Sequence, residues 1–385
     1  MRAAAISSRK LNERWRKLAD ETVGCVQGKF FATLIGKAMK QMKRLISVAC
    51  LVIFCAFGGP IKAANAETNE VRIGWQPAAW FEFFYAQQEK LFEKAGLKPT
   101  FVKFTSTPPM LAAFKAGDLD IAFGGMPAYV AGVDEGMDVS LFCWLETVNT
   151  SLIMQPSEEI TSAKQLVGKK IAVINGTSAQ YTLLKYLNAE KIPLKDVSLV
   201  YMSIPSLLPA FANKDVDGVS VWEPWGIKLM SAGGKPFGPF VGASDYLQPA
   251  IYWGRRQWMA DHPQTMKMFL AALDESLRAI NAKPEAGAEA LARYAGMDAA
   301  DALKILTLNK QLIVKDMREA LEESSFALKP KPGETYSGQV RFTKEMADFL
   351  YHNGNITREL SLDEIAKATA PEYMEAYISS RPPAK

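Results

Sequence analysis

A short stretch of this chain occurs twice, and the repeat limits what the chain can fold into. Residues 106–120 return in altered form, without a gap, at residues 203–217. The matching positions are Ser106 and Ser203, Pro108 and Pro205, Leu111 and Leu208, Ala113 and Ala210, Phe114 and Phe211, Asp118 and Asp215, and Asp120 and Asp217. Each copy indicates a helix opened by a Ser or Thr cap and a proline, then an acidic turn, then a buried strand. The chain is therefore predicted to hold two similar α/β units with a cleft between them.

The N-terminal segment indicates an export signal. Met42-Lys43-Arg44 precedes the uncharged apolar run 45–57, and Ala64-Asn65-Ala66 has the small-x-small form of a signal peptidase site. We expect a basic extension over 1–41, a cleavable signal peptide over 42–66, and a mature periplasmic protein that begins near Glu67. An uncleaved N-terminal anchor is the alternative.

The charge of the expected mature chain argues against a nucleic-acid partner. Residues 1–66 hold 12 of the 45 Lys and Arg and 3 of the 41 Asp and Glu, which leaves 33 basic and 38 acidic side chains. A nucleic-acid-binding domain would carry a basic surface instead. Cys143 is the one cysteine after the leader, so an oxidising compartment finds no disulfide to form. The remaining length exceeds what one core usually supports, which favours two lobes.

Alternating strands and helices indicate an α/β fold of two lobes. The expected strands are 71–75, 99–104, 119–124, 139–145, 152–155, 170–174, 198–202 and 218–222. The expected helices are 81–95, 107–116, 127–136, 178–190, 206–213 and 224–232. Such alternation predicts a mainly parallel sheet flanked by helices in each lobe. From His262 to about Ala370 the sequence is mostly helical, and this tail needs a partner to pack on.

We therefore predict a discontinuous first lobe. It would consist of residues 67–155 plus 246–385, with the helical tail packed on it, and lobe two would consist of residues 156–245. The two chain crossings would form a hinge. A pair of independent tandem domains is the alternative, and it leaves the helical tail without a sheet to cover.

The candidate ligand site lies where strands end and helices begin, because ligands of open α/β sheets bind there. The residues at four such junctions are Ser106, Thr107, Gly125, Met126, Thr177, Ser178, Trp222 and Glu223. Gln76, Asn149 and Gln180 are candidate neutral donors, and Trp80, Tyr181 and Tyr252 are candidate aromatic contacts. Helix starts offer backbone N–H groups and a partial positive charge, which together can hold a small anion. The alternative is that the hydroxyl residues are ordinary helix caps.

Two further patterns bear on the chemistry. Trp222 and Glu223 place an aromatic ring beside a carboxylate, which suits a cation or an amine, although Glu223 would equally cap its own helix. The histidines, His262 and His352, fall in the helical tail, and no metal-ligand spacing, phosphate loop or nucleophile elbow is found. We expect a binding protein without enzymatic activity, cofactor or metal.

Three motifs carry a family resemblance: 112–121 (AAFKAGDLDI), 168–173 (GKKIAV) and 217–225 (DGVSVWEPW). Over about 67–263 the chain resembles the substrate-binding proteins of ABC importers for nitrate, aliphatic sulfonates and taurine, and the related thiamine-precursor binders. The resemblance implies a type II periplasmic-binding fold, a small-molecule ligand, monomeric action and a permease at the inner membrane. Gly125 and Met126 stand where sulfonate binders often have paired serines, which makes the pocket less polar and leaves room for a larger organic or aromatic anion.

Other functions on this fold stay open at this point. A binder of a pyrimidine or thiamine precursor is the first alternative. A pyrimidine-synthase-type enzyme would need a histidine and a cysteine-rich segment near the cleft. The effector domain of a regulator would need a DNA-binding helix pair, which residues 1–41 do not supply.

Overall fold

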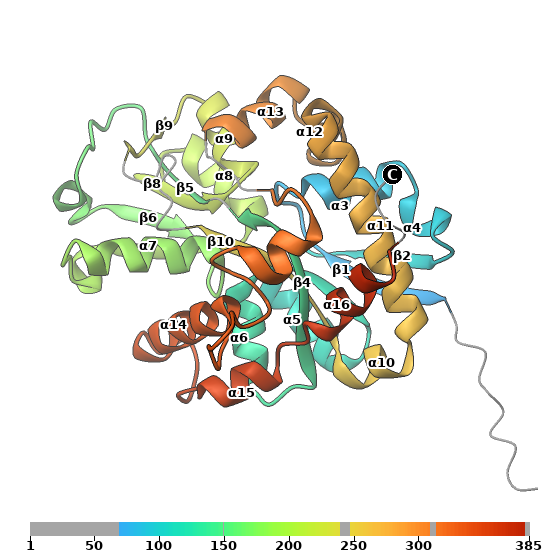
Figure 1. Ribbon diagram of the computed structural model, residues 1–385. Helices are drawn as coiled ribbons and strands as arrows, with labels where there is room; N and C mark the ends of the chain where they lie inside the picture. The colour runs from blue at the N-terminus through green and yellow to red at the C-terminus, as the bar shows by residue number, and fades with distance from the viewer. Residues whose placement is uncertain (1–68, 149, 239–246, 309–312, 382–385) are drawn as a thin grey trace, which may run out of the picture. The chain divides into compact units, whose positions relative to one another are not determined.

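The strand that follows each repeat, 121–125 or 218–222, is the central strand of a five-stranded sheet. Figure 1 shows how the helices and strands are arranged. The computed structural model describes residues 69–148, 150–238, 247–308 and 313–381. The first sheet, in the order β2-β1-β3-β10-β4, consists of β1 (Glu70–Trp75), β2 (Lys98–Lys103), β3 (Ile121–Gly125), β4 (Val139–Val148) and β10 (Gln248–Arg255). The second sheet, in the order β7-β6-β8-β5-β9, consists of β5 (Thr150–Met154), β6 (Lys170–Val173), β7 (Ser198–Tyr201), β8 (Gly218–Trp222) and β9 (Lys235–Pro236).

The last aspartate of each repeat makes the same contact in its own sheet. The Asp120 carboxylate accepts a hydrogen bond of 2.9 Å from the backbone N–H of Arg72, the third residue of β1. The Asp217 carboxylate accepts one of 2.7 Å from the backbone N–H of Lys170 at the start of β6. Each aspartate therefore ties its buried strand to the neighbouring parallel strand, and the predicted duplication is confirmed as a structural one.

The repeated helices also end alike. They are α5 (Thr107–Ala116) and α8 (Ile204–Ala212), and α8 begins two residues before the predicted start at Ser206. A residue with positive φ follows each helix, Gly117 at 94° and Lys214 at 63°. Glycine adopts this left-handed conformation freely, whereas lysine does so at a cost. The second copy thus makes the turn with a lysine in place of the glycine.

Each sheet is mixed, with two parallel and two antiparallel strand pairings, and its flanking helices confirm the predicted two-lobe α/β fold class. In the first sheet β10 runs antiparallel to both β3 and β4, and in the second β5 runs antiparallel to β8. β10 is not among the strands expected from the sequence, because it follows the last expected helix of the α/β alternation, at 224–232. It contains a proline, Pro249, at the second of its eight residues, opposite Thr147.

The first crossing between the sheets lies earlier than predicted. Because β5 pairs with β8, the chain leaves the first sheet between Val148 and Thr150, not after Gln155. We keep the division into two lobes as a proposal with this boundary moved. The second crossing, near residue 246, lies outside the described residues.

Helices cover the sheets, and one predicted helix is broken. The remaining helices of the α/β part are α3 (Phe81–Gln88), α4 (Leu91–Lys94), α6 (Met126–Asp134), α7 (Ser178–Ala189) and α9 (Trp225–Ser231), with 3₁₀ turns at Ala163–Leu166 and Leu194–Asp196. A single helix was expected over 81–95. The chain turns at Lys90, whose φ is 54°, and this left-handed residue separates α3 from α4.

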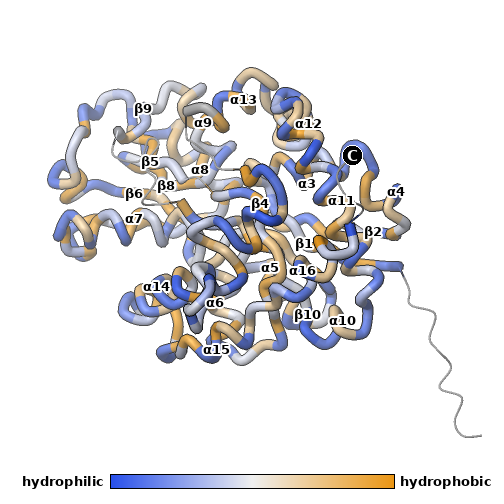
Figure 2. Tube along the Cα trace, viewed as in Figure 1, coloured by the Kyte–Doolittle hydropathy of each residue, from blue (hydrophilic) through white to orange (hydrophobic). Residues whose placement is uncertain are grey.

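The C-terminal helices pack on the first sheet's helices, as predicted. They are α10 (Arg256–Asp261), α11 (Pro263–Ala282), α12 (Pro284–Ala295), α13 (Ala299–Leu308), a π-helical turn at Glu319–Glu323, α14 (Gly338–His352), α15 (Leu362–Lys367) and α16 (Glu372–Ser379). α11 and α12 contact α3, and α14 contacts α6. Along α11 and α14 hydrophobic and hydrophilic residues alternate (Figure 2), as expected for helices that bury one face.

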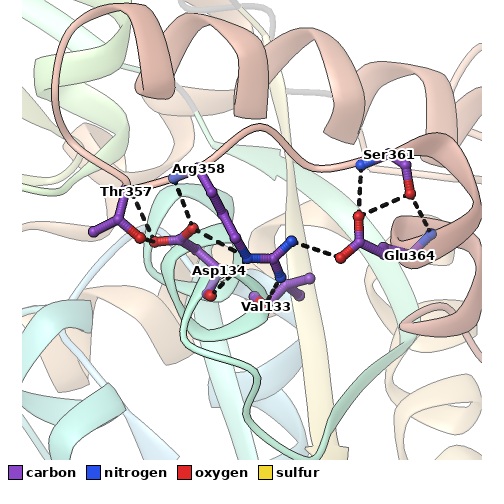
Figure 3. Close-up of polar contacts among 6 residues, drawn as sticks. All are labelled: Val133, Asp134, Thr357, Arg358, Ser361 and Glu364. Carbon is purple, nitrogen blue, oxygen red and sulfur yellow. Dashed lines mark hydrogen bonds and ion pairs between the residues drawn. The ribbon is translucent and has the colours of Figure 1, made fainter.

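Polar contacts tie this tail to the end of α6 (Figure 3). The Asp134 carboxylate, buried in α6, accepts hydrogen bonds from the backbone N–H groups of Thr357 and Arg358 at 2.9 and 3.2 Å. Arg358 also pairs with Glu364 at 2.6 Å. The backbone N–H and hydroxyl of Ser361 and the Arg358 guanidinium lower the pKa of Glu364 to about 2.

The segments predicted at the N-terminus lie outside the described residues, since these begin at Asn69. The extension over 1–41 and the signal peptide over 42–66 therefore remain predictions. Within the part of the chain that the structure describes, no helix is long and apolar enough to cross a membrane.

Candidate functional site

The first turn of α7 has three backbone N–H groups without an acceptor inside the helix. Thr177 occupies the N-cap position, but its hydroxyl donates to the carbonyl oxygen of Ile174 at 2.7 Å and makes no capping hydrogen bond with the described residues. The N–H groups of residues 178–180 belong to the first turn, so they have no acceptor within the helix. The partial positive charge of the helix start adds to them. This geometry suits an anionic group of a ligand.

The starts of α5 and α6 are poorer in N–H donors than the sequence suggested, because prolines interrupt them. In α5, Pro108 and Pro109 leave Thr107 as the only one of the first three residues with an N–H. In α6, Pro127 leaves two such residues, Met126 and Ala128. Neither start receives a side-chain capping bond from the residues described. Together the two helix starts carry three backbone N–H groups in their first three positions.

A polar contact at the end of β1 orders the start of α5. The Thr107 hydroxyl donates to the side-chain oxygen of Gln76 at 2.9 Å, and the Trp80 indole N–H donates to the Gln76 carbonyl oxygen at 2.8 Å. All three residues are buried. Thr107 is therefore held by Gln76 and does not act as a simple cap.

The fourth junction differs, because its helix start is already occupied. Glu223 is 1% exposed, and one carboxylate oxygen accepts from the Ser151 hydroxyl at 2.7 Å. The other accepts from the backbone N–H of Ile227, in the first turn of α9, at 2.9 Å. This arrangement favours the capping interpretation of Glu223 over the recognition of a cation.

The helix starts of the two sheets meet face to face. A Cβ atom placed on Gly125, at the start of α6, would lie 2.3 Å from the Ser178 hydroxyl oxygen at the start of α7. A Cβ atom on Gly176 would lie 3.4 Å from Pro108 Cγ. Both approaches join a segment of the first sheet to one of the second. The absence of side chains at Gly125 and Gly176 is what lets the two halves come this close.

Several predicted contacts belong to the protein interior instead. Tyr252 lies in β10, where its ring stacks on Phe123 with centroids 3.9 Å apart and its hydroxyl donates to Glu82 at 3.0 Å. Trp80 packs on the same Phe123 at 4.6 Å. Both rings are at most 1% exposed. These two aromatic residues therefore fill the core of the first half.

Met126 and Tyr181 face α14 rather than the meeting helix starts. The Met126 sulfur accepts from the Gln339 side chain at 3.4 Å, and the Tyr181 ring packs edge-on against Phe349 at 5.2 Å. Burial raises the pKa of the Tyr181 hydroxyl. Asn149 lies outside the described residues.

The structure thus assembles part of the predicted set. The residues brought together at the junction of the two sheets are Gln76, Ser106, Thr107, Gly125, Thr177, Ser178 and Trp222. Sequence reasoning missed Pro77, whose carbonyl oxygen accepts the Trp222 indole N–H at 2.9 Å, because a backbone oxygen leaves no signal in a sequence. It also gave Gly176 no role of its own.

Cys143 and His352 differ in their exposure. Cys143 is fully buried in β4, and burial raises the pKa of its thiol well above the usual value. His352 is exposed near the C-terminal end of α14. Among the described residues, no group of three or more His, Cys, Asp or Glu side chains is placed to hold a metal ion.

Two mixed sheets flanked by helices and a helical C-terminal region match the two-lobe α/β fold of periplasmic-binding proteins. Residues 79–287 match the family described as NMT1/THI5 like, and the chain belongs to this family.

The alignments with two curated relatives span most of each relative's length. A putative aliphatic sulfonates-binding protein of Bacillus subtilis is 28% identical over 254 residues, which are 61% of this chain and 74% of the relative. The taurine-binding periplasmic protein of Escherichia coli is 23% identical over 226 residues, 58% of this chain and 70% of the relative.

Solved structures share the fold. The alkanesulfonate-binding protein SsuA of Xanthomonas axonopodis, bound to MOPS, has a TM-score of 0.65 at 20% identity, with 79% of this chain and 99% of that chain covered. The desulfurization enzyme DSZB has a TM-score of 0.57 at 14% identity, with 80% and 99% covered. The fold therefore carries both binding proteins and at least one enzyme.

Proposed function

We propose that this protein is a periplasmic solute-binding protein that delivers a small organic anion or zwitterion to an ABC importer. The observation that supports it most is the meeting of helix starts from both sheets, of which the start of α7 offers three N–H groups without a side-chain cap among the described residues. Such groups bind an anion by hydrogen bonds and the helix dipole, without an arginine. The names of the sulfonate- and taurine-binding relatives agree with this chemistry.

The proposal includes export and a transport partner. The protein would be exported through the signal peptide over 42–66, act as a monomer, and present both lobes to a permease at the inner membrane. Hinge closure around a ligand is the known behaviour of periplasmic binding proteins. Catalysis is not part of the proposal, and the Cys143 thiol is buried in β4.

A thermal-unfolding screen tests the proposed function. The ligands are taurine, alkane- and arylsulfonates, nitrate, bicarbonate and pyrimidines. A true ligand at one hundred times its dissociation constant stabilises the folded state by about 2.7 kcal/mol. We expect at least one organic anion to raise the melting temperature. If pyrimidines alone do so, the ligand class is wrong, and if nothing does, the site is wrong.

A matched pair of variants gives the screen its control. Ser178→Asp places a carboxylate at the first position of α7, where it favours the helix but repels an anionic ligand. Ser203→Asp replaces one good N-cap by another at the exposed start of α8. The first variant should lose the ligand-induced shift, and the second should keep it.

A further inference from the structure

An apolar pocket of about 380 Å³ lies between α5 and α6, beside the meeting helix starts. Its walls include Leu111 and Ala112 of α5, Ala128 and Ala131 of α6, and Leu350 at the end of α14. The volume falls at the lower end of the range for small-molecule sites. Small side chains at 112 and 131 leave this space open.

The pocket begins at the candidate ligand site. Pro108 and Pro127 line it, and they are the second residues of α5 and α6. Gly176 lines it as well, and it immediately precedes Thr177, the N-cap residue of α7. Each of the three helix starts therefore contributes a wall residue, so an extended ligand bound at these starts would have the pocket next to it.

The far end of the pocket is polar. Lys115 and Glu135 line it there and form an ion pair, and both side chains are largely exposed. Lys115 lies seven residues beyond Pro108, which is about 10 Å along a helix axis. The pocket thus offers about 10 Å of mostly apolar wall between the helix starts and a charged pair.

We propose that this pocket receives the hydrocarbon part of an organic anion whose charged head is held at the helix starts. The inference rests on the proposed function and narrows its ligand class to alkyl or aryl sulfonates with a body of several carbon atoms. Gly176 comes from the second half, so the pocket is complete only when the halves meet. Burial of the hydrocarbon part would then favour the closed form.

Isothermal titration of the purified protein with methane-, butane- and octanesulfonate tests the inference. Each methylene group that enters the pocket should raise the affinity about fourfold. Ala112 lines the pocket from an exposed position, so in Ala112→Phe the ring narrows its opening. The preference for octane- over methanesulfonate should then fall at least tenfold while methanesulfonate binding changes less than twofold. Ala131→Leu, which fills the pocket from α6, should act in the same direction. Ala300→Phe adds a ring at an exposed position of α13 and should leave the whole series unchanged.

The possible outcomes separate the inference from the function on which it rests. Equal affinities along the series in the unchanged protein would overturn the inference and leave the proposed function standing. A preference that survives in both pocket-filling variants would also overturn it, because the hydrocarbon part would then bind elsewhere. If no sulfonate of any length binds, the pocket inference and the proposed function are both contradicted.

Discussion

The indole N–H of Trp222 donates a hydrogen bond of 2.9 Å to the carbonyl oxygen of Pro77. Trp222 is the last residue of β8 in the second sheet, and Pro77 follows β1 of the first. This bond joins the carboxyl ends of two strands from different sheets. It therefore belongs to the form of the protein in which the two halves are in contact.

Trp222→Phe should weaken ligand binding. The ring remains, but the bond to Pro77 is lost, and a hydrogen bond of this kind contributes about 1 kcal/mol, or about fivefold in affinity. Trp225→Phe is the control, because the Trp225 indole N–H has no hydrogen-bond partner among the described residues. Titration calorimetry of both variants checks this, and equal affinities for the two would contradict the role of the bond.

Gly125→Ala should hinder the meeting of the helix starts. The added methyl group would lie 2.3 Å from the Ser178 hydroxyl oxygen, while the backbone of Gly125, with φ −75°, suits alanine. Overpacking of this kind costs about 1–3 kcal/mol, so we expect an affinity loss of about tenfold.

A double-mutant cycle isolates that contact. In a Ser178→Ala background the hydroxyl is gone, and Gly125→Ala should then change the affinity less than threefold. The same loss in both backgrounds would show that the methyl group acts through another neighbour.

Glu223→Gln should leave the affinity for an amine-bearing ligand such as taurine unchanged, since the carboxylate is engaged by Ser151 and Ile227. Glu223→Ala should lower the free energy of unfolding by about 1–3 kcal/mol, because it leaves buried donors unpaired. Urea unfolding measures the second effect. A taurine affinity that falls in the glutamine variant while its stability is preserved would restore the ion-pair role.

Glu82 should make the folded protein less stable as the pH rises. Burial raises the pKa of this carboxyl above its usual value of 4.5, so the folded state binds the proton more tightly than the unfolded state. This contribution to stability is fully present below pH 4.5 and is lost as the pH rises toward the folded-state pKa.

Urea unfolding at several pH values between 4.5 and 8 measures this dependence. Glu82→Gln keeps an acceptor for the Tyr252 hydroxyl and should show a smaller fall in unfolding free energy across the range. Glu93→Gln, at an exposed position of α4, should behave like the unchanged protein. A Glu82 variant with the full dependence would contradict the prediction.

The repeat made the centre of each half predictable. The two aspartates at its end, Asp120 and Asp217, each bond to the neighbouring parallel strand, and this local pattern needs no knowledge of the rest of the chain. β10 was not predictable in the same way, because its place between β3 and β4 depends on pairing with residues one hundred or more positions earlier. The break between α3 and α4 at Lys90 was not predictable either, because a lysine in a sequence does not indicate a left-handed conformation.

For the candidate site, the sequence located the helix starts but could not divide the aromatic residues between core and cleft. Trp80 and Tyr252 are residue types that often contact ligands. Their packing on Phe123 shows that they belong to the core. Glu223 had two roles open, and its bond to Ile227 supports capping. Such assignments depend on tertiary neighbours, which one sequence does not reveal.

A crystal structure with a bound organic sulfonate tests the central claim most directly. We predict that sulfonate oxygens accept hydrogen bonds from the backbone N–H groups at the start of α7, and that the ligand also contacts the start of α5 or α6. A ligand bound with full occupancy away from all three helix starts would contradict the account.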